Sequence, residues 1–288
     1  MKELNDSLPS ATALFSAAAR AAHVLVDNPP HLIRDTDAIA VCELFEPSPL
    51  AFQLAFPSAP VLAAARASAV IRSWFAQSII AQTGLDQLVV LGAGLDTSIA
   101  APSGQTWVVD TAAVLAWRAE LFGLAAIHDT AHQVPVDLAS GDLSAALTDA
   151  GLDITRPAVV VALGLSMYLT GAQFQALLKR LAVLAPGSVL VFDALAPEAD
   201  ADEAGRAYAA AVTAQAGGRE PWRWRPNGEA LSQALAHAGW NADIRAEAEV
   251  VSSDFRRANP QLPVMRLVQL IHARTGVAGT LNADESAG

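Results

Sequence analysis

The chain has 288 residues, of which 53% are hydrophobic, enough to bury one large core or one core with a cap. Acidic residues outnumber basic residues 29 to 18, for a net charge of −11, so we expect no nucleic-acid partner. The single cysteine, Cys42, excludes an internal disulfide and a zinc cluster built from cysteines. The sequence has no recognisable export signal and no apolar run of membrane-spanning length. These features predict a cytoplasmic protein with no membrane partner.

The first part of the chain lacks strong strand patterns and is rich in alanine. A helix is predicted over Ser10–Val26, opened by a Ser or Thr cap and closed at the following Asp-Asn-Pro-Pro. Two more helices are predicted over Asp37–Phe45 and Pro60–Thr83. We interpret residues 1–85 as a helical N-terminal lid or substrate region in front of a core.

From residue 87 onward, short apolar runs alternate with helical patterns. The predicted strands are Gln87–Leu91, Thr106–Val109, Gln133–Val136, Ala158–Leu163 and Val189–Phe192. The helices predicted between them are Ala112–Leu124, Leu143–Ala150 and Ala172–Leu184. This alternation predicts an α/β fold, a mostly parallel sheet with helices on both faces.

The last part of the chain predicts two helices and a closing pair of strands. In chain order the elements are a helix ending near Ala216, a helix over Asn227–Gly239 capped by Asn227, and strands over Trp240–Val251 and Val264–Ala273. The two strands are close enough in sequence to form an antiparallel hairpin at the sheet edge. The core then covers residues 86–275, and residues 276–288 are predicted to be a flexible tail.

The strongest candidate for a binding site is the turn Leu91-Gly92-Ala93-Gly94-Leu95-Asp96-Thr97, which follows the first predicted strand. Glycines at the carboxyl end of a strand let the backbone pass close to a ligand. A dinucleotide site usually needs a third glycine for the pyrophosphate, and Thr97 stands where it would fall. A short Gly-x-Gly followed by Asp96 suits S-adenosylmethionine (SAM), which has no phosphate. A purely structural turn is the alternative.

Acidic residues end the next two predicted strands. Asp110, followed by Thr111, could accept hydrogen bonds from ribose hydroxyls or cap the next helix. Asp137 could accept from the adenine amino group while Leu138 packs on the ring, although a strand-terminal Asp is more often a turn residue.

These motifs occur in the order and spacing of a known family. The sequence resembles the leucine carboxyl methyltransferase-like group of class I SAM-dependent methyltransferases, in its bacterial branch, which includes polyketide carboxyl methyltransferases. The matching segments are Thr12–Ala22, Ile71–Phe75, Leu91–Thr97, Val109–Arg118, Val136–Leu138 and Leu163–Leu169. The resemblance implies a Rossmann-like fold with a seven-stranded, mostly parallel sheet whose last strand is antiparallel.

The resemblance also implies a cofactor site for SAM, with S-adenosylhomocysteine (SAH) as product. Arg72 would hold the SAM carboxylate, because a guanidinium grips a carboxylate in a forked pair. The residues expected to bind the cofactor are Arg72, Gly92, Ala93, Gly94, Asp96, Asp110, Thr111, Asp137, Leu138 and Leu163.

Three positions depart from the family pattern. Leu163 stands where the family usually has a Glu that helps to hold the SAM amino group. Trp74 replaces the second Arg of an Arg-Thr-Arg sequence, and Ser98 replaces an Arg after the glycine turn. Losing a charge-assisted hydrogen bond weakens binding by about 1.5–3 kcal/mol.

The methyl acceptor would bind beside the cofactor. Tyr168 is the candidate catalytic residue, and Trp222, Arg223, Trp224 and Arg225 combine flat apolar surface with two cations, which would suit an aromatic carboxylate. A surface loop with cation–π stacking is the alternative. A carboxylate acceptor needs no general base because it is already ionised, whereas a phenol or alcohol would need one.

The resulting prediction is a SAM-dependent O-methyltransferase for a small molecule, with a carboxylate acceptor favoured, in bacterial secondary metabolism. The less polar residues at Leu163 and Trp74 motivate an alternative, a non-methylating cyclase or pericyclase acting on a polyketide-like substrate. A nicotinamide-dependent dehydrogenase is disfavoured by the missing third glycine. His128 and His132 lack a clear third ligand, so no metal is expected, and the protein is expected to be a monomer or homodimer.

Overall fold

The computed structural model describes residues 2–3, 8–101, 104–216 and 221–276. Of the predicted flexible tail only its first residue, Gly276, lies within this range, so that prediction falls outside the described residues. Within the described part, no helix is both long enough and apolar enough to cross a membrane.

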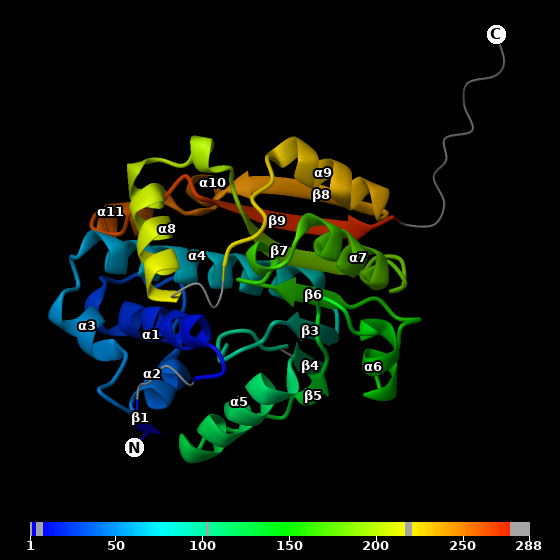
Figure 1. Ribbon diagram of the computed structural model, residues 1–288, viewed down its shortest axis with the longest axis horizontal. Helices are drawn as coiled ribbons and strands as arrows, with labels where there is room; N and C mark the ends of the chain where they lie inside the picture. The colour runs from blue at the N-terminus through cyan, green and yellow to red at the C-terminus, as the bar shows by residue number, and fades with distance from the viewer. Residues whose placement is uncertain (1, 4–7, 102–103, 217–220, 277–288) are drawn as a thin grey trace, which may run out of the picture.

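The centre of the protein is a twisted seven-stranded sheet with the order β5-β4-β3-β6-β7-β9-β8 (Figure 1). Its strands are β3 (Gln87–Leu91), β4 (Gln105–Asp110), β5 (His132–Pro135), β6 (Val159–Ala162), β7 (Val189–Leu195), β8 (Trp240–Ala246) and β9 (Val268–Thr275). The first five are parallel, and β9 runs antiparallel to both of its neighbours. The predicted parallel sheet with an antiparallel last strand is therefore confirmed.

Helices cover both faces of this sheet. They are α4 (Pro60–Thr83), α5 (Ala112–Leu124), α6 (Leu143–Asp149), α7 (Gly171–Leu181), α8 (Glu203–Ala216), α9 (Gly228–His237), α10 (Glu247–Val250) and α11 (Ser253–Ala258). Alternate residues of β3 pack into two separate cores, Leu88 with α4 on one face and Val89 with α6, α7 and α9 on the other. Burial on both faces explains why the parallel strands read as continuous apolar runs rather than as alternating patterns.

The N-terminal region contributes α1 (Ala11–Val26), α2 (Thr36–Cys42) and α3 (Leu50–Ala55), together with a short parallel pair of strands, β1 (Lys2–Glu3) and β2 (Phe45–Glu46). The small side chains of Ala17 and Ala21 let α1 pack closely into a third core that also contains Trp117 and Leu121 of α5. This packing places α1 over the carboxyl ends of the central strands. That the region acts as a lid stays a prediction.

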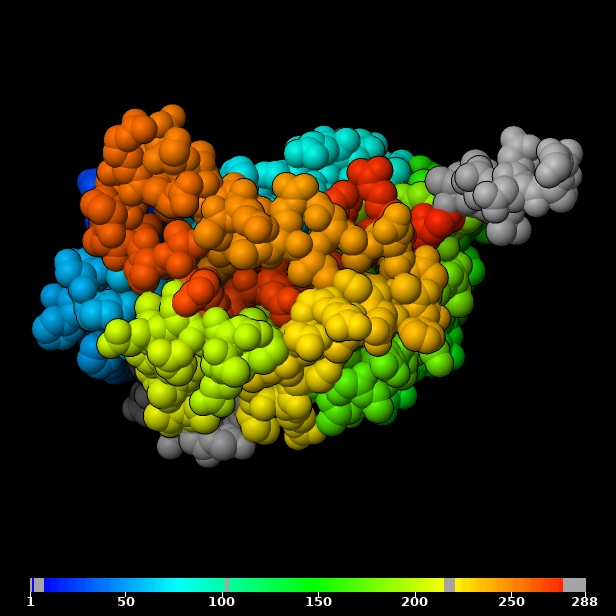
Figure 2. Space-filling view, turned by 90° about the horizontal axis from the view of Figure 1, so that it is seen from above, coloured from blue at the N-terminus to red at the C-terminus, as the bar shows by residue number. Residues whose placement is uncertain are grey.

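One strand boundary predicted for the C-terminal part was wrong. The strand predicted over Trp240–Val251 ends at Ala246, where the Glu249 side chain accepts a hydrogen bond from the Ala246 N–H and starts α10. The last two strands pair antiparallel at the edge of the sheet, as predicted, with β9 between β7 and β8 and β8 as the edge strand. Much of the face seen in Figure 2 is formed by this later part of the chain, from α8 in yellow-green to β9 in red.

Candidate active site

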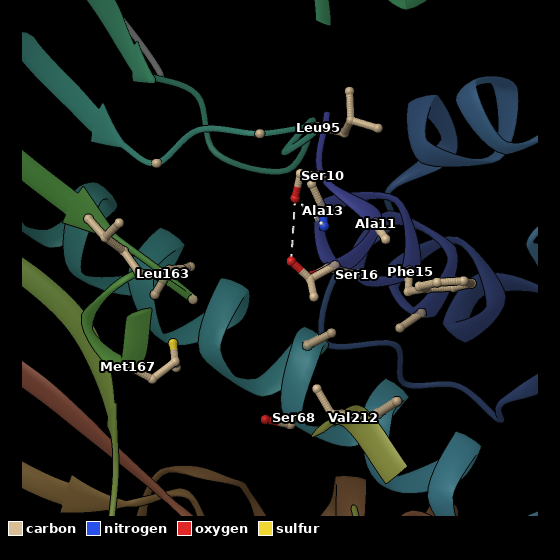
Figure 3. Close-up of a pocket in the computed structure, with 18 of the residues that line it drawn as sticks. Ser10, Ala11, Ala13, Phe15, Ser16, Ser68, Leu95, Leu163, Met167 and Val212 are labelled. Carbon is tan, nitrogen blue, oxygen red and sulfur yellow. Dashed lines mark hydrogen bonds between the residues drawn. The ribbon is translucent and has the colours of Figure 1, made fainter. Parts of the chain in front are cut away.

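A cavity of about 710 Å³ opens at the carboxyl ends of the central parallel strands, which is where ligands bind in open α/β sheets. Its walls come from the glycine turn after β3, the segment after β6, and helices α1, α4 and α8. In Figure 3, Leu163 and Met167 lie on one side and Ser10, Ser16 and the rest of α1 on the other. The cavity therefore joins the sheet to the N-terminal helices.

The glycine turn forms one end of the cavity, and its geometry requires glycine twice. Gly92 and Gly94 have φ angles of 64° and 46°, in the left-handed region that side chains disfavour. A Cβ on Gly92 would lie 3.2 Å from the Leu165 side chain, and one on Gly94 would lie 3.0 Å from Cβ of Ala13. The turn thus keeps its backbone at the cavity surface and lets α1 approach it closely.

Two buried arginines hold this turn from behind. Nη1 of Arg118 donates to the carbonyl oxygens of Gly94 and Asp96, at 3.2 and 2.8 Å. Nη2 of Arg20 donates to the carbonyl of Leu95 at 2.9 Å. The carbonyls of these consecutive residues are therefore fixed by charge-assisted hydrogen bonds, which keeps the turn in one conformation.

Asp110 ends β4 beside the turn. Its Oδ2 accepts from the Gly94 N–H at 3.0 Å and its Oδ1 from the Thr111 N–H at 2.8 Å. Burial raises the pKa of Asp110 despite these hydrogen bonds. Each carboxylate oxygen keeps a lone pair that could accept from a hydroxyl. Thr111 caps α5, because its side chain accepts from the Val114 N–H. Asp110 is therefore not the helix cap, which was the alternative role considered for it.

Arg72 reaches the cavity from α4 and is held on two sides. Its Nη2 donates to Oγ of Ser16 at 2.8 Å, and its Nη1 lies 3.4 Å from Oδ2 of Asp193. Asp193 is fully buried on β7, and its Oδ1 accepts from the Gly164 N–H at 2.6 Å. Sequence reasoning did not assign Ser16 or Asp193 to the site. The available signal for Asp193 was an acid directly after the apolar run Val189–Phe192 that was predicted as a strand.

The three departures from the family pattern have different positions. Leu163 lines the cavity, while Trp74 and Ser98 do not, so only one of them changes the cavity surface. The neighbouring strand β7 brings a different carboxylate, that of Asp193, to the same cavity. Asp96 also lines it and accepts from the backbone N–H and hydroxyl of Ser98, both at 2.7 Å.

Several of the predicted acceptor residues reach the other end of the cavity. Tyr168, Trp222 and Arg223 line it, with the Arg223 N–H donating to the Met167 carbonyl at 2.6 Å. Tyr208 of α8, which sequence reasoning missed, also lines it. Burial raises the pKa of Tyr208 to about 12, so its hydroxyl stays a neutral donor at physiological pH.

Four predicted site residues do not line the cavity. The Asp137 carboxylate accepts from the Ala139 N–H and the Ser140 hydroxyl, as the turn interpretation expected, and Leu138 is buried in the core.

Trp224 packs its ring on Phe174 at 4.6 Å, and Arg225 donates to the Ala196 carbonyl at 2.9 Å. Trp224 and Arg225 are thus held by contacts outside the cavity lining, and the predicted substrate role of these two residues and adenine role of Asp137 and Leu138 stay predictions.

The remaining candidates lie elsewhere. His132 is exposed on β5 and stacks on Trp107, and no cluster of three potential metal ligands occurs among the residues that the structure describes. Cys42 is fully buried, and burial raises the pKa of its thiol to about 12.

The strand order, the glycine turn after β3 and the acid at the end of β4 define the class I methyltransferase fold. A crystal structure of a "putative methyltransferase" from Thermobifida fusca YX superposes with a TM-score of 0.58 at 16% identity, covering 94% of this chain and 100% of that chain. A DUF574 family protein from Streptomyces avermitilis superposes with a TM-score of 0.56 at 18% identity, covering 78% of this chain and 88% of that chain. At these identities the likeness shows the fold alone.

The family model for leucine carboxyl methyltransferases matches residues 13–182, more than half of the chain. The protein therefore belongs to the leucine carboxyl methyltransferase family, as the sequence motifs predicted.

A Mycobacterium avium (strain 104) protein named "Putative S-adenosyl-L-methionine-dependent methyltransferase" is 34% identical over 175 residues, which is 58% of this chain and 53% of that protein. A Frankia alni protein with a similar name is 36% identical over 126 residues, 41% of this chain and 44% of that protein. The chain thus spans about half the length of the curated relatives it matches.

Proposed function

We propose that this protein is a SAM-dependent O-methyltransferase for a small apolar molecule, with a carboxylate as the favoured acceptor. The observation that carries the proposal is one cavity with two chemically different ends. One end presents Arg72, Asp110 and the glycine turn, and the other is walled mainly by apolar and aromatic residues of α1, α4, α8 and the segment around Trp222. Two relatives are named as SAM-dependent methyltransferases, which supports SAM as the cofactor.

The donor set of the polar end fits SAM. Arg72, already oriented by Ser16 and Asp193, offers a guanidinium to the amino-acid carboxylate. Asp110 offers carboxylate oxygens to the ribose hydroxyls, and the Cβ-free surface of Gly92 and Gly94 leaves room for the ligand. When bound, SAM supplies an electrophilic methyl group on a positively charged sulfur.

The residues of the chain then have two tasks, alignment and exclusion of water. The arginine-held glycine turn and the braced Arg72 fix the cofactor end before any ligand arrives. The helices α1, α4 and α8 line the cavity, and an apolar acceptor bound between them would displace water from that end. A carboxylate acceptor is ionised at neutral pH and needs no base, so this arrangement suffices for it.

The exposed guanidinium of Arg223 at the cavity, beside Trp222, suits the attraction of an anionic acceptor. Bacterial secondary metabolism stays the proposed setting. The alternative of a non-methylating cyclase rests on the apolar side chain of Leu163 at the cavity.

The test is calorimetric titration with SAM and SAH, followed by incubation with SAM and a panel of aliphatic and aromatic carboxylates and phenols. Methyl transfer predicts micromolar cofactor binding and a product heavier by one methyl group in mass spectrometry. Cofactor binding with no methylated product from any compound class would favour the cyclase. No binding of SAM or SAH would refute the proposal.

A further inference from the structure

Ser68, which lines the cavity, forms a buried pair with Glu247, which lies behind the lining, and neither the sequence motifs nor the family match assigns this pair. Ser68 lies on α4 one turn before Arg72, about 6 Å along the helix axis, and lines the same cavity. Figure 3 shows Ser68 beside Val212, away from Leu95 and the glycine turn. Its Oγ is 2.9 Å from Oε1 of Glu247.

Glu247 is unusual because it is fully buried and only half satisfied. None of its surface is exposed, and its Oε2 has no hydrogen-bond partner among the described residues. An ionised carboxylate with one bare oxygen is costly to bury, whereas the neutral acid is much less so. The burial and the unpartnered oxygen therefore favour the acid form of Glu247.

The groups that face Glu247 come from four parts of the chain. They are Ser68 and Arg72 of α4, Asp193 of β7, Asp202 before α8, and Tyr208 of α8. Burial raises the pKa of Glu247 to about 8, with Asp193 and Asp202 adding to the increase and Ser68 and Arg72 opposing it. Glu247 is then mostly protonated at pH 7.

The protonation state of Glu247 decides what Ser68 offers to the cavity. The two oxygens share one bridging proton at 2.9 Å. An ionised Glu247 accepts from the Ser68 hydroxyl, which leaves only lone pairs of Ser68 for a ligand. An acid Glu247 donates to Oγ, which frees the hydroxyl proton of Ser68 to donate into the cavity.

We propose that Ser68 donates a hydrogen bond to the carboxylate of the methyl acceptor, and that Glu247 in its acid form is the positioning residue that turns the hydroxyl toward it. The inference rests on the proposed function and narrows it to an acceptor with an anionic oxygen and an apolar body. A deprotonating base is not part of this arrangement, because Glu247 already carries its proton.

The experiment measures octanoate and benzoate binding by calorimetry to SAH-saturated protein at pH 7 and pH 9. The variants are Ser68→Ala, Glu247→Gln and, as a matched control on the same helix, Ser78→Ala, whose hydroxyl donates to the Trp74 carbonyl and which does not line the cavity. Circular dichroism of each variant checks the fold. Infrared difference spectra between wild type and Glu247→Gln at pH 7 test for the acid carbonyl band without any acceptor.

For wild type we expect a carboxylate affinity that falls about tenfold between pH 7 and pH 9, as a group with a pKa of about 8 ionises. Ser68→Ala should weaken carboxylate binding about tenfold at pH 7 and leave SAH binding unchanged. Glu247→Gln should keep the pH 7 affinity at both pH values, because the amide N–H also donates to Ser68. Ser78→Ala should behave as wild type.

Failure of the inference is distinct from failure of the proposed function. If the protein binds SAH but no carboxylate, or if Ser68→Ala binds both carboxylates normally, the inference is wrong while the proposed methyl transfer is not contradicted. Loss of SAH affinity in Ser68→Ala would place Ser68 at the cofactor and overturn it. Methylation of 1-octanol that disappears in Glu247→Gln would make the pair a base for hydroxyl acceptors, which also overturns it. No SAH binding by wild type would instead refute the proposed function.

Discussion

Arg72 and Asp193 meet at the polar end of the cavity, with Nη1 of the arginine 3.4 Å from Oδ2 of the aspartate. Asp193 is fully buried, whereas the Arg72 side chain keeps 18% of its surface exposed. Nη2 of Arg72 also donates to Ser16, so each terminal nitrogen has one partner and keeps a second N–H for a ligand. Such an anchored cation is suited to a forked pair with a ligand carboxylate, because part of the cost of ordering the side chain is already met by the fold.

This geometry predicts that Arg72→Lys weakens SAH binding by about 1.5–3 kcal/mol, since an ammonium cannot form the forked pair. Calorimetric titration of SAH measures the change. Arg257→Lys on α11, where the arginine side chain is 77% exposed, is the matched control and should bind as wild type. Equal affinities in wild type and Arg72→Lys would remove Arg72 from the cofactor site.

The glycine turn allows the same substitution to be compared at two positions. Gly94→Ala should destabilise the fold by about 1–2 kcal/mol and weaken SAH binding, because φ is 46° and the new Cβ would meet Ala13 at 3.0 Å. Gly123→Ala, in α5 with no atom near its Cβ position, should stabilise the protein by about 0.5–1 kcal/mol. Urea unfolding of both variants checks the signs, and a stable Gly94→Ala that binds SAH normally would contradict the turn's assigned role.

Asp110 gives SAH binding a specific dependence on pH. Burial raises its pKa, so the carboxylate that would accept from ribose is lost at a higher pH than for an exposed aspartate. We expect SAH affinity to fall on acidification through this raised pKa, and Asp110→Asn to bind more weakly at neutral pH with a flatter acid profile. Asp149→Asn, at an exposed position on α6, is the control. An unchanged profile in Asp110→Asn would assign the titration to another group.

A buried ion pair joins Asp27, at the end of α1, to Arg66 of α4, and we expect it to stabilise the fold. Nε and Nη2 of Arg66 donate to Asp27 at 3.0 and 3.1 Å, and Nδ1 of His23 lies 2.9 Å from the same carboxylate. Arg66→Met should cost about 3–5 kcal/mol in the free energy of unfolding, because it leaves Asp27 buried without its main partner. Arg245→Met, at an exposed position, should change it by less than about 0.5 kcal/mol.

The same pair predicts a pH dependence of stability. Burial alone would raise the pKa of Asp27, but hydrogen bonds from His23 and Arg66 lower it below its ordinary value. A lowered folded-state pKa contributes stability above the unfolded pKa, and this stability is lost as pH falls toward the folded pKa. Denaturant unfolding between pH 6 and the acid limit should show a smaller acid loss in Asp27→Asn than in wild type. Parallel profiles would show that Asp27 does not carry this linkage.

The sequence alone determined the class of fold and predicted the residues that line the polar end of the cavity. Continuous apolar strands such as Gln87–Leu91, alternating with helices, can only be buried between two helical layers. The glycine turn and Asp110 could be predicted to lie at a binding cavity, which they line, because ligands bind at the carboxyl ends of strands in such sheets.

The tertiary structure decided which distant groups complete the site. Asp193 beside Arg72, Tyr208 in the wall and the pair of Ser68 with Glu247 join residues up to 179 positions apart, and no local pattern marks such contacts. The aromatic and basic residues Trp222–Arg225 also have different positions in the fold. Trp222 and Arg223 line the cavity, whereas Trp224 packs on Phe174, and the sequence pattern could not distinguish them. Periodicity and turn chemistry are local properties of a chain, whereas side-chain partners across a cavity are set only when the sheet brings its strands together.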